Sequence, residues 1–220
     1  AQDAWPSKPV RVIVPWPAGG VVDLVTRSVT DRLAVVFKQP FVVEPRPGAN
    51  GNIGTEAAAR TPADGYTLLT ASPATVTQPL LSSTARFKTA DFVGVGLIGA
   101  PPNVFVVSPT LPVKSVKELV DHARANPGKL SVTNPGVGTS NHLGQELLFG
   151  LTGMDMQNVM YKTQAEMLPD LINGMHALSL VTIGLSLAIN GIVCDSYPRV
   201  AGAALAAGWE FMGHSYVQVP

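Results

Sequence analysis

The first part of the chain alternates short apolar runs with longer segments in which apolar side chains recur every three or four positions. Val10–Val14 is an apolar run broken only by Arg11, which predicts a buried strand. Over residues 22–37 the apolar positions with the spacing of one helix face are Val22, Val25, Val29, Leu33 and Val36. Further strands are predicted at 40–44 and 65–71, with a helix from Thr55 between them. Strands that alternate with helices predict a parallel sheet covered on both faces.

The chain repeats this pattern after a break at 92–107. Two apolar runs are separated there by Ala100–Asn103, whose adjacent prolines disfavour both a helix and a central strand, so we predict a crossing between two lobes. Ser115 is a predicted N-cap with Glu118 as its capping-box partner, and Asn126–Gly128 predicts the helix end. The later elements are a strand at 129–133, a turn at 134–141, a helix at 142–151 and elements at 158–161, 165–172 and 178–181. Two α/β lobes joined at a hinge would enclose a cleft.

Composition narrows the class of protein. The 220 residues include 15 basic and 15 acidic side chains without a run of five like charges, so we expect no nucleic-acid partner. With 46% hydrophobic and 14% charged residues, the composition is that of a globular protein rather than a disordered one. Cys194 is the single cysteine and cannot form an intramolecular disulfide, and no Cys or His spacing resembles a zinc site, so no metal is expected.

Two segments bear on the location of the protein. The stretch 177–193 is uncharged but contains Asn190, serines and glycines, which favours a buried strand followed by a core helix over a membrane span. The N-terminal residues lack the basic and apolar regions of a signal peptide and resemble a mature end left by signal cleavage, although a trimmed chain would look the same. We therefore expect a soluble protein.

Two strand-to-helix loops are the candidate binding positions, Pro15–Asp23 in one lobe and Asn134–His142 in the other. Such loops lie at the C-terminal ends of parallel strands, and each following helix start presents unpaired N–H groups and a partial positive charge that attract a carboxylate or phosphate. The glycines that let a ligand approach the backbone are Gly19, Gly20, Gly136 and Gly138, and the hydrogen-bonding side chains are Thr139, Ser140, Asn141 and His142. Tight turns with nothing bound would use the same residue types.

Other features of the chain point to alternatives. Asp23 lies in the first helical turn and would compete with a bound anion, so we expect it to cap its own helix or to meet a ligand's amino group. Gly48–Gly54 lacks the G-x-G start and the distant acid of a dinucleotide site, which favours a long turn. No Walker lysine or G-x-S-x-G elbow is present, so no cofactor is expected. A hydrolase or transferase that uses Ser140 and His142 stays an alternative, although a catalytic histidine also needs an orienting carboxylate.

Taken in order, several phrases of the chain resemble the periplasmic solute-binding proteins of tripartite tricarboxylate transporters, the Bug or TctC-like family. The resemblance runs from about Trp5 to Gly174 and includes WPSKPVRVIVPWPAGGVVD, QPFVVEPRPGANGNIGTEAAARTPADGYTLL, APPNVFVVSPTLPVKSVKELVDHARANPGKL, NPGVGTSNHLGQEL and VMYKT. It implies an α/β, two-lobe periplasmic binding protein fold of the type II kind. Each lobe would be a mainly parallel sheet flanked by helices, with the ligand cleft between the lobes.

The resemblance also implies a function. We expect a non-catalytic, monomeric receptor in the periplasm, its signal peptide already removed. It would capture a small di- or tricarboxylate, an aromatic carboxylate or an acidic amino acid by hinge closure and deliver it to membrane permease subunits of a tripartite tricarboxylate transporter. A sensory binding protein is the alternative within this class.

Carried over residue by residue, the resemblance implies ligand contacts in both lobes. In the first lobe these are Trp16, Pro17, Ala18, Gly19, Gly20 and Ser72. In the second lobe they are Gly136, Gly138, Thr139, Ser140, Asn141, His142 and, near the far end of the ligand, Tyr161. The family has an acidic residue beside the cleft where this chain has Val181 or Thr182, so Thr182 completes the set.

The chain departs from the family after Gly174. The segment Ile189–Tyr197 is shorter than its counterpart, and relatives continue past the point at which this sequence stops, with helices that cover the first lobe. We therefore expect a first lobe of residues 1–100 and about 199–220, with its C-terminal part incomplete, and a second lobe of residues 101–198. This expectation of an incomplete or partly uncertain sequence would be contradicted by an intact mass near 23.0 kDa.

Overall fold

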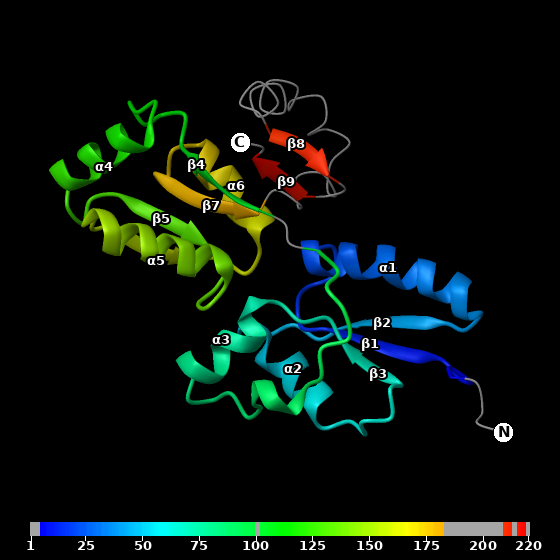
Figure 1. The fold of residues 1–220 in the computed structure, drawn as a ribbon. Coiled ribbons are helices and arrows are strands. Elements are labelled where there is room, and N and C mark those ends of the chain that lie inside the picture. The colour runs from blue at the N-terminus through cyan, green and yellow to red at the C-terminus, as the bar shows by residue number, and fades with distance from the viewer. Residues whose placement is uncertain (1–4, 100–101, 183–208, 213–214, 219–220) are drawn as a thin grey trace. The chain divides into compact units, whose positions relative to one another are not determined.

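The computed structural model describes residues 5–99, 102–182, 209–212 and 215–218. The described residues up to Pro102 fall in one compact unit, whereas Asn103–Thr182 form a second (Figure 1). Each unit has its own sheet. The expected lobe boundary at residues 198 and 199 lies outside the described residues, as does Cys194, and the predicted lobe boundaries stay a prediction.

In its described residues up to Pro102, the first unit is built on a parallel sheet with the strand order β2-β1-β3. The strands are β1 (Val10–Val14), β2 (Phe41–Pro45) and β3 (Thr67–Leu69). The apolar side chains of the central strand β1 are at most 5% exposed, because a parallel strand is covered on both faces. The helices are α1 (Val21–Phe37), α2 (Asn52–Ala59) and α3 (Pro73–Leu81), and α1 and α2 lie on opposite sides of the sheet (Figure 1). The predicted parallel sheet flanked by helices is confirmed here.

The long turn predicted at 48–54 is only partly present, and that prediction was wrong at its C-terminal end. A 3-10 turn, η1 (Ala49–Gly51), leads directly into α2, which begins three residues before the predicted start at Thr55. Gly51 has a φ of 90°, and glycine adopts this left-handed conformation without the steric cost of a Cβ. A second 3-10 turn, η2 (Thr89–Asp91), precedes residues 92–99, which form neither helix nor strand.

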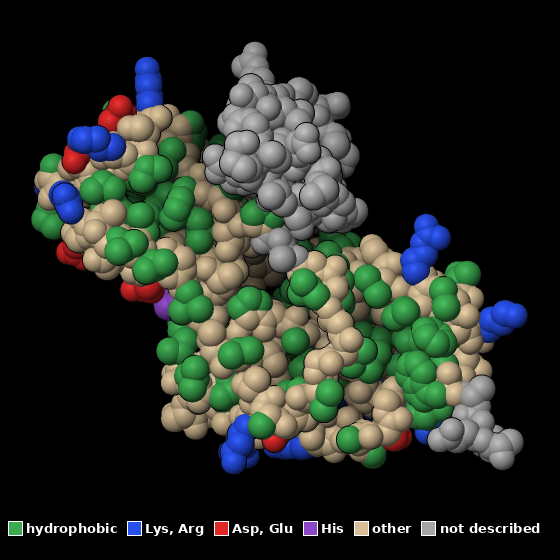
Figure 2. Space-filling view, viewed as in Figure 1, with side chains coloured by type: hydrophobic (Ala, Val, Ile, Leu, Met, Phe, Trp, Pro, Cys, Tyr) green, Lys and Arg blue, Asp and Glu red, His purple; other side chains and the backbone are tan. Residues whose placement is uncertain are grey.

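Helix α1 is present where the apolar spacing predicts it, but it buries a polar face. Its fully buried residues are Asp23, Thr26 and Thr30, and Thr26 forms a hydrogen bond of 3.0 Å with Thr70, just after β3. Val36, at the end of the predicted apolar stripe, is 71% exposed. Hydrophobic side chains are accordingly visible on the surface of this unit (Figure 2).

The second unit contains a mixed sheet with the order β4-β7-β5-β6. Its strands are β4 (Asn103–Val107), β5 (Ser131–Asn134), β6 (Gln157–Met160) and β7 (Leu178–Thr182). Strands β5, β6 and β7 are parallel, whereas β4 is antiparallel to β7, with Asn103 opposite Thr182. The second half of the predicted crossing is therefore an edge strand of this sheet, a position that tolerates the preceding prolines. The sheet is mainly parallel, as predicted.

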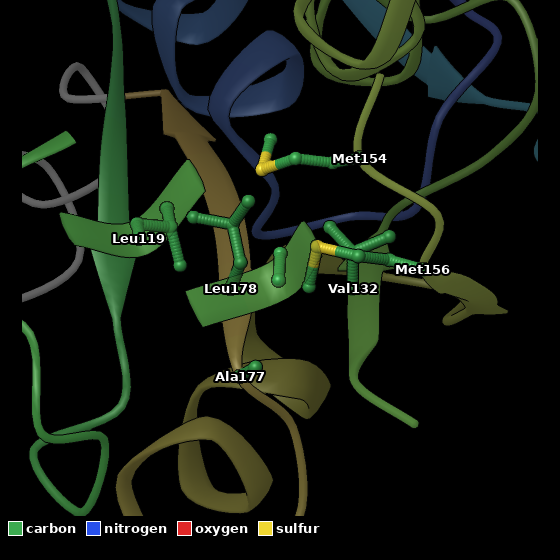
Figure 3. Packing of buried hydrophobic residues seen from close by; sticks show 7 residues of the cluster. Leu119, Val132, Met154, Met156, Ala177 and Leu178 are labelled. Carbon is green, nitrogen blue, oxygen red and sulfur yellow. The ribbon is translucent and has the colours of Figure 1, made fainter. Parts of the chain in front are cut away.

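The helices of the second unit are α4 (Val116–Ala125), α5 (Ser140–Thr152) and α6 (Gln164–Ile172). Ser115 caps α4 by accepting a hydrogen bond from the Glu118 N–H, as predicted, but the Glu118 carboxylate accepts from Lys114 instead of Ser115. The core brings together α4, the strands and the residues after α5 (Figure 3). Its buried members are Leu119, Ala123, Val132, Met154, Met156, Ala177 and Leu178.

A short antiparallel pair is also described, β8 (Trp209–Met212) with β9 (Ser215–Gln218). Among the helices in the described part of the chain, none has the length and apolarity that a membrane span requires. The core helix predicted after β7 lies outside the described residues.

Candidate functional site

The first candidate loop, predicted at Pro15–Asp23, joins β1 to α1 through residues 15–20. Gly19 has a φ of 78°, which favours glycine, and an added Cβ there would meet no atom within 4 Å. Gly20 is the N-cap of α1 and offers no side chain, so no side-chain cap protects the helix start. The N–H groups of the first helical turn therefore point out of the helix without the side-chain acceptor that a serine or threonine would supply.

The loop is supported from below by α2. A Cβ placed on Gly54 would lie 2.7 Å from the Pro15 Cα and 2.7 Å from the Arg46 carbonyl oxygen. The Arg46 N–H in turn donates to the Val14 carbonyl at 2.7 Å. The loop is thus held by backbone-to-backbone packing that only a glycine at position 54 permits.

Two of the predicted ligand-binding residues of the first unit, Trp16 and Ser72, form a hydrogen bond with each other. The Trp16 indole N–H donates to the Ser72 hydroxyl at 3.3 Å. Ser72 is the N-cap of α3, and its own N–H donates to the Thr75 hydroxyl at 3.2 Å. The hydroxyl of Ser72 therefore lies beside the first loop, at the carboxyl edge of the parallel sheet, where ligands of open α/β sheets bind.

Asp23 lies under the first loop, and the expectation that it caps its own helix was wrong, because the start of α1 has no side-chain cap. Its Oδ2 accepts from the Gly19 N–H at 2.9 Å and from the Arg27 Nε at 2.9 Å. Burial raises the pKa of Asp23, but the hydrogen bonds from Arg27 and Gly19 outweigh it and the pKa lies below its ordinary value. Asp23 is therefore ionised at neutral pH, and the Gly19 N–H, expected to face a ligand, is already used inside the loop.

The second candidate loop, predicted at Asn134–His142, joins β5 to α5 through residues 135–139 and is organised differently. Asn134 is fully buried, its Oδ1 accepts from the Gly136 N–H at 3.0 Å, and its amide donates to Gln145 and Asn158. Thr139 caps α5 by accepting from the His142 N–H, and its hydroxyl donates to the Gly136 carbonyl at 2.8 Å. This helix start is therefore capped by its own chain.

Asn141 and Thr182 belong to one buried junction. The Asn141 amide, in a side chain only 4% exposed, donates to the Leu180 carbonyl at 2.5 Å and lies 3.3 Å from the Thr182 hydroxyl. The Thr182 hydroxyl donates to Asn103 Oδ1 at 2.7 Å. Both side chains thus tie the start of α5 to β4 and β7, and their predicted ligand contacts stay predictions.

Ser140 and His142 do not form a nucleophile and base pair. They are two positions apart on α5 and so point away from each other, and within the described residues no hydrogen bond joins them. The His142 Nδ1 accepts from the Gly138 N–H at 3.4 Å, and its Nε2 lies 3.6 Å from Glu146. In the described residues, His142 is therefore a residue of the helix start that bonds to its own loop.

Tyr161 follows β6, and its hydroxyl is engaged inside the second unit. It donates to Asp170 Oδ2 at 2.5 Å and lies 2.8 Å from the His176 Nε2, while the His176 Nδ1 lies 2.8 Å from the Ser131 hydroxyl. The hydrogen bond to Asp170, together with burial, raises the pKa of Tyr161 to about 12. Sequence reasoning missed this network because Ser131, Asp170 and His176 form no spaced motif. Only the fold brings them together.

Tyr161→Phe is expected to remove a late phenol titration. The raised pKa means that the hydrogen-bond network contributes stability below the ordinary phenol pKa of about 10 and loses it as the pH rises through about 12. Absorbance near 295 nm should show one tyrosine that ionises near pH 12 in the unaltered protein and is absent in the variant. The same titration curve in both proteins would contradict the network.

Within the described residues, no group of three or more His, Cys, Asp or Glu side chains could hold a metal ion. What the fold does provide is a parallel sheet in the first unit and a mainly parallel sheet in the second, each with a glycine-containing loop and a helix start at its carboxyl edge. This arrangement is that of an α/β protein with candidate ligand-binding loops at the carboxyl edges of its sheets.

Comparison with known proteins names the family. Residues 25–190 match the family model described as "Tripartite tricarboxylate transporter family receptor", and the chain belongs to this family. BugT of Bordetella pertussis is 35% identical over 181 residues, which are 81% of this chain and 56% of BugT. A Pseudomonas sp. (strain P51) UPF0065 protein is 35% identical over 173 residues, which are 78% of this chain and 52% of that protein. The chain thus spans about half the length of the curated relatives it matches.

Solved structures give the same result. Rpa4515 of R. palustris, solved with adipate, is 36% identical with a TM-score of 0.77 over 83% of this chain and 62% of its own. MatC from Rhodopseudomonas palustris, solved with bound malate, is 25% identical with a TM-score of 0.73 over 84% of this chain and 64% of its own. The two-lobe periplasmic binding protein fold expected from the sequence is confirmed as the fold class, and the family is one of receptors.

Proposed function

We propose that the protein is a periplasmic receptor that binds a small organic carboxylate and delivers it to the permease subunits of a tripartite tricarboxylate transporter. The main support for the proposal is the start of α1, which follows Gly19 and Gly20 and has no side-chain cap. Free N–H groups and a partial positive charge at a helix start attract a carboxylate. The adipate and malate of two structural relatives are carboxylates of this kind.

The proposed mechanism is capture by a monomer through hinge closure. Ser72 and Trp16 add hydrogen-bonding groups beside the first loop, and the residues from Gly136 to His142 are the predicted contacts of the second loop. A ligand that contacts both loops stabilises the closed arrangement by its differential affinity for it. Binding without catalysis is supported by the geometry of α5, where Ser140 and His142 are not paired.

The test is a thermal-shift panel on refolded protein, free of any co-purified ligand. The panel contains di- and tricarboxylates, aromatic carboxylates and acidic amino acids. At a hundredfold excess over Kd, a true ligand should stabilise the protein by on the order of 3 kcal/mol. A flat response across the panel would sink the proposal.

A pair of variants at Gly20 tests the site itself. Gly20→Asp places a carboxylate at the N-cap, where the ordinary backbone angles of φ −75° and ψ 168° suit it. The new side chain should satisfy the helix start, keep the protein folded and abolish carboxylate binding. Gly20→Ala adds only a Cβ, 3.2 Å from the Pro17 carbonyl oxygen, and should keep most of the affinity. Equal affinity in Gly20→Asp and the unaltered protein would place the ligand elsewhere.

A further inference from the structure

The second oxygen of the Asp23 carboxylate makes no hydrogen bond within the described part of the chain. Asp23 is only 2% exposed, and its Oδ1 is a buried atom without a hydrogen-bond partner among the described residues. The other oxygen, Oδ2, already accepts from Gly19 and Arg27. A buried acceptor that is left unpaired destabilises the fold, since its lone pairs lose water without gaining another donor.

The unpaired oxygen lies in the proposed binding region. Because Oδ2 accepts from the Gly19 N–H, the carboxylate is fixed directly under the loop that precedes the uncapped start of α1. The loop is open above Gly19, where an added Cβ would contact nothing within 4 Å. The region thus holds backbone donors and one unsatisfied acceptor within the same turn of chain.

The charge of Asp23 restricts which ligand groups can form a hydrogen bond with its unpaired oxygen. As an ionised carboxylate it accepts hydrogen bonds but cannot donate them. It does not repel a bound anion strongly, because Arg27 forms an ion pair with it at 2.9 Å. A ligand's carboxylate can therefore bind the helix start, whereas Oδ1 requires a hydrogen-bond donor, such as a hydroxyl or ammonium group of the ligand.

We propose that Asp23 Oδ1 is a specificity-determining acceptor, and that the receptor prefers carboxylates with a hydroxyl or amino group on the carbon next to the carboxylate. The proposal rests on the proposed function and names its substrate class. The carboxylate of such a ligand binds the start of α1, and the adjacent donor reaches Oδ1 as the loop closes on it. A plain dicarboxylate leaves this oxygen unpaired and binds more weakly.

The experiment compares matched acids by calorimetry with the unaltered protein. One series is succinate, malate and aspartate, and the other is adipate, 2-hydroxyadipate and 2-aminoadipate. A hydrogen bond to a buried charged group predicts that the substituted acid of the series that binds is favoured by about tenfold or more. Equal affinities within a series would mean that a fixed water fills the position, and would overturn the proposal while leaving carboxylate binding intact. The absence of binding by every acid would instead overturn the proposed function together with this inference.

A pair of variants tests whether Asp23 causes the preference for hydroxy and amino acids over plain dicarboxylates. Asp23→Asn keeps the size and an oxygen for the Gly19 N–H but can replace the unpaired acceptor by an amide donor, so the ratio between substituted and plain acid should fall to about one. Asp31→Asn removes an exposed acid of the same helix and should keep the preference. Far-UV circular dichroism and urea unfolding check that both variants fold. A preference retained in Asp23→Asn would overturn the assignment to Asp23.

Discussion

Leu178→Ala is expected to lower the free energy of unfolding of the second unit by about 3 kcal/mol. Leu178 is fully buried in β7, between the side chains of the core that Figure 3 shows. Removing its branched end leaves a cavity that the closely packed neighbours can fill only in part. Urea unfolding followed by far-UV circular dichroism measures the loss.

Leu151→Ala is the matched control for this prediction. Leu151 lies on α5 in the same unit and is 76% exposed, so its removal should change the unfolding free energy by less than about 0.5 kcal/mol. Equal losses in the two variants would show that Leu178 is not packed as described.

Gly54→Ala is expected to destabilise the first unit by about 3 kcal/mol, the upper end of the usual cost of overpacking. The new methyl group would lie 2.7 Å from two backbone groups, the Pro15 Cα and the Arg46 carbonyl, and backbone cannot rotate aside as a side chain can. Either α2 or the first loop has to move. On the proposed function, the thermal stabilisation by a carboxylate should therefore fall together with the stability.

Gly150→Ala separates this steric effect from the general effect of replacing a helical glycine. An added Cβ at Gly150 meets no atom within 4 Å, and alanine favours a helix interior over glycine by about 0.5–1 kcal/mol. The control should thus be neutral or slightly more stable. A Gly54→Ala protein as stable as this control would contradict the close contact between α2 and the loop.

The elements marked by proline, glycine and capping residues could be predicted closely from the sequence. The apolar run of β1, the spacing of α1 and the cap at Ser115 are local signals, and the structure has all three. The start of α5 was expected at His142 and lies at Ser140 because Thr139 provides the cap. Local signals place helices and strands because the forces involved act within a few residues.

The pairing of distant residues could not be predicted in this way. Strand β4 pairs antiparallel with β7, which lies at the opposite end of the second unit in the sequence, so no local signal indicates the pairing. Helix α1 buries polar residues in addition to Leu33 of the predicted apolar stripe, which packs against the core. The buried polar residues are explained by partners such as Thr70 that follow another strand. The candidate site also combines local and long-range features. Its glycine loops could be found from the sequence, whereas the hydrogen bond from Tyr161 to Asp170 and the unpaired oxygen of Asp23 could be found only from the structure.

The pairing of Asn103 with Thr182 brings the two ends of the second unit together. The chain enters the unit at Asn103 and leaves it at Thr182, and these residues face each other across two antiparallel strands, at a Cα separation of about 5 Å. Domains whose two chain ends lie close together tolerate circular permutation and insertion into another protein, because both ends can be joined at one place. We therefore expect that residues 103–182 can be exchanged as one segment between members of this receptor family. The hydrogen bond from the Thr182 hydroxyl to Asn103 should be kept in such an exchange, because it joins the two ends of the segment.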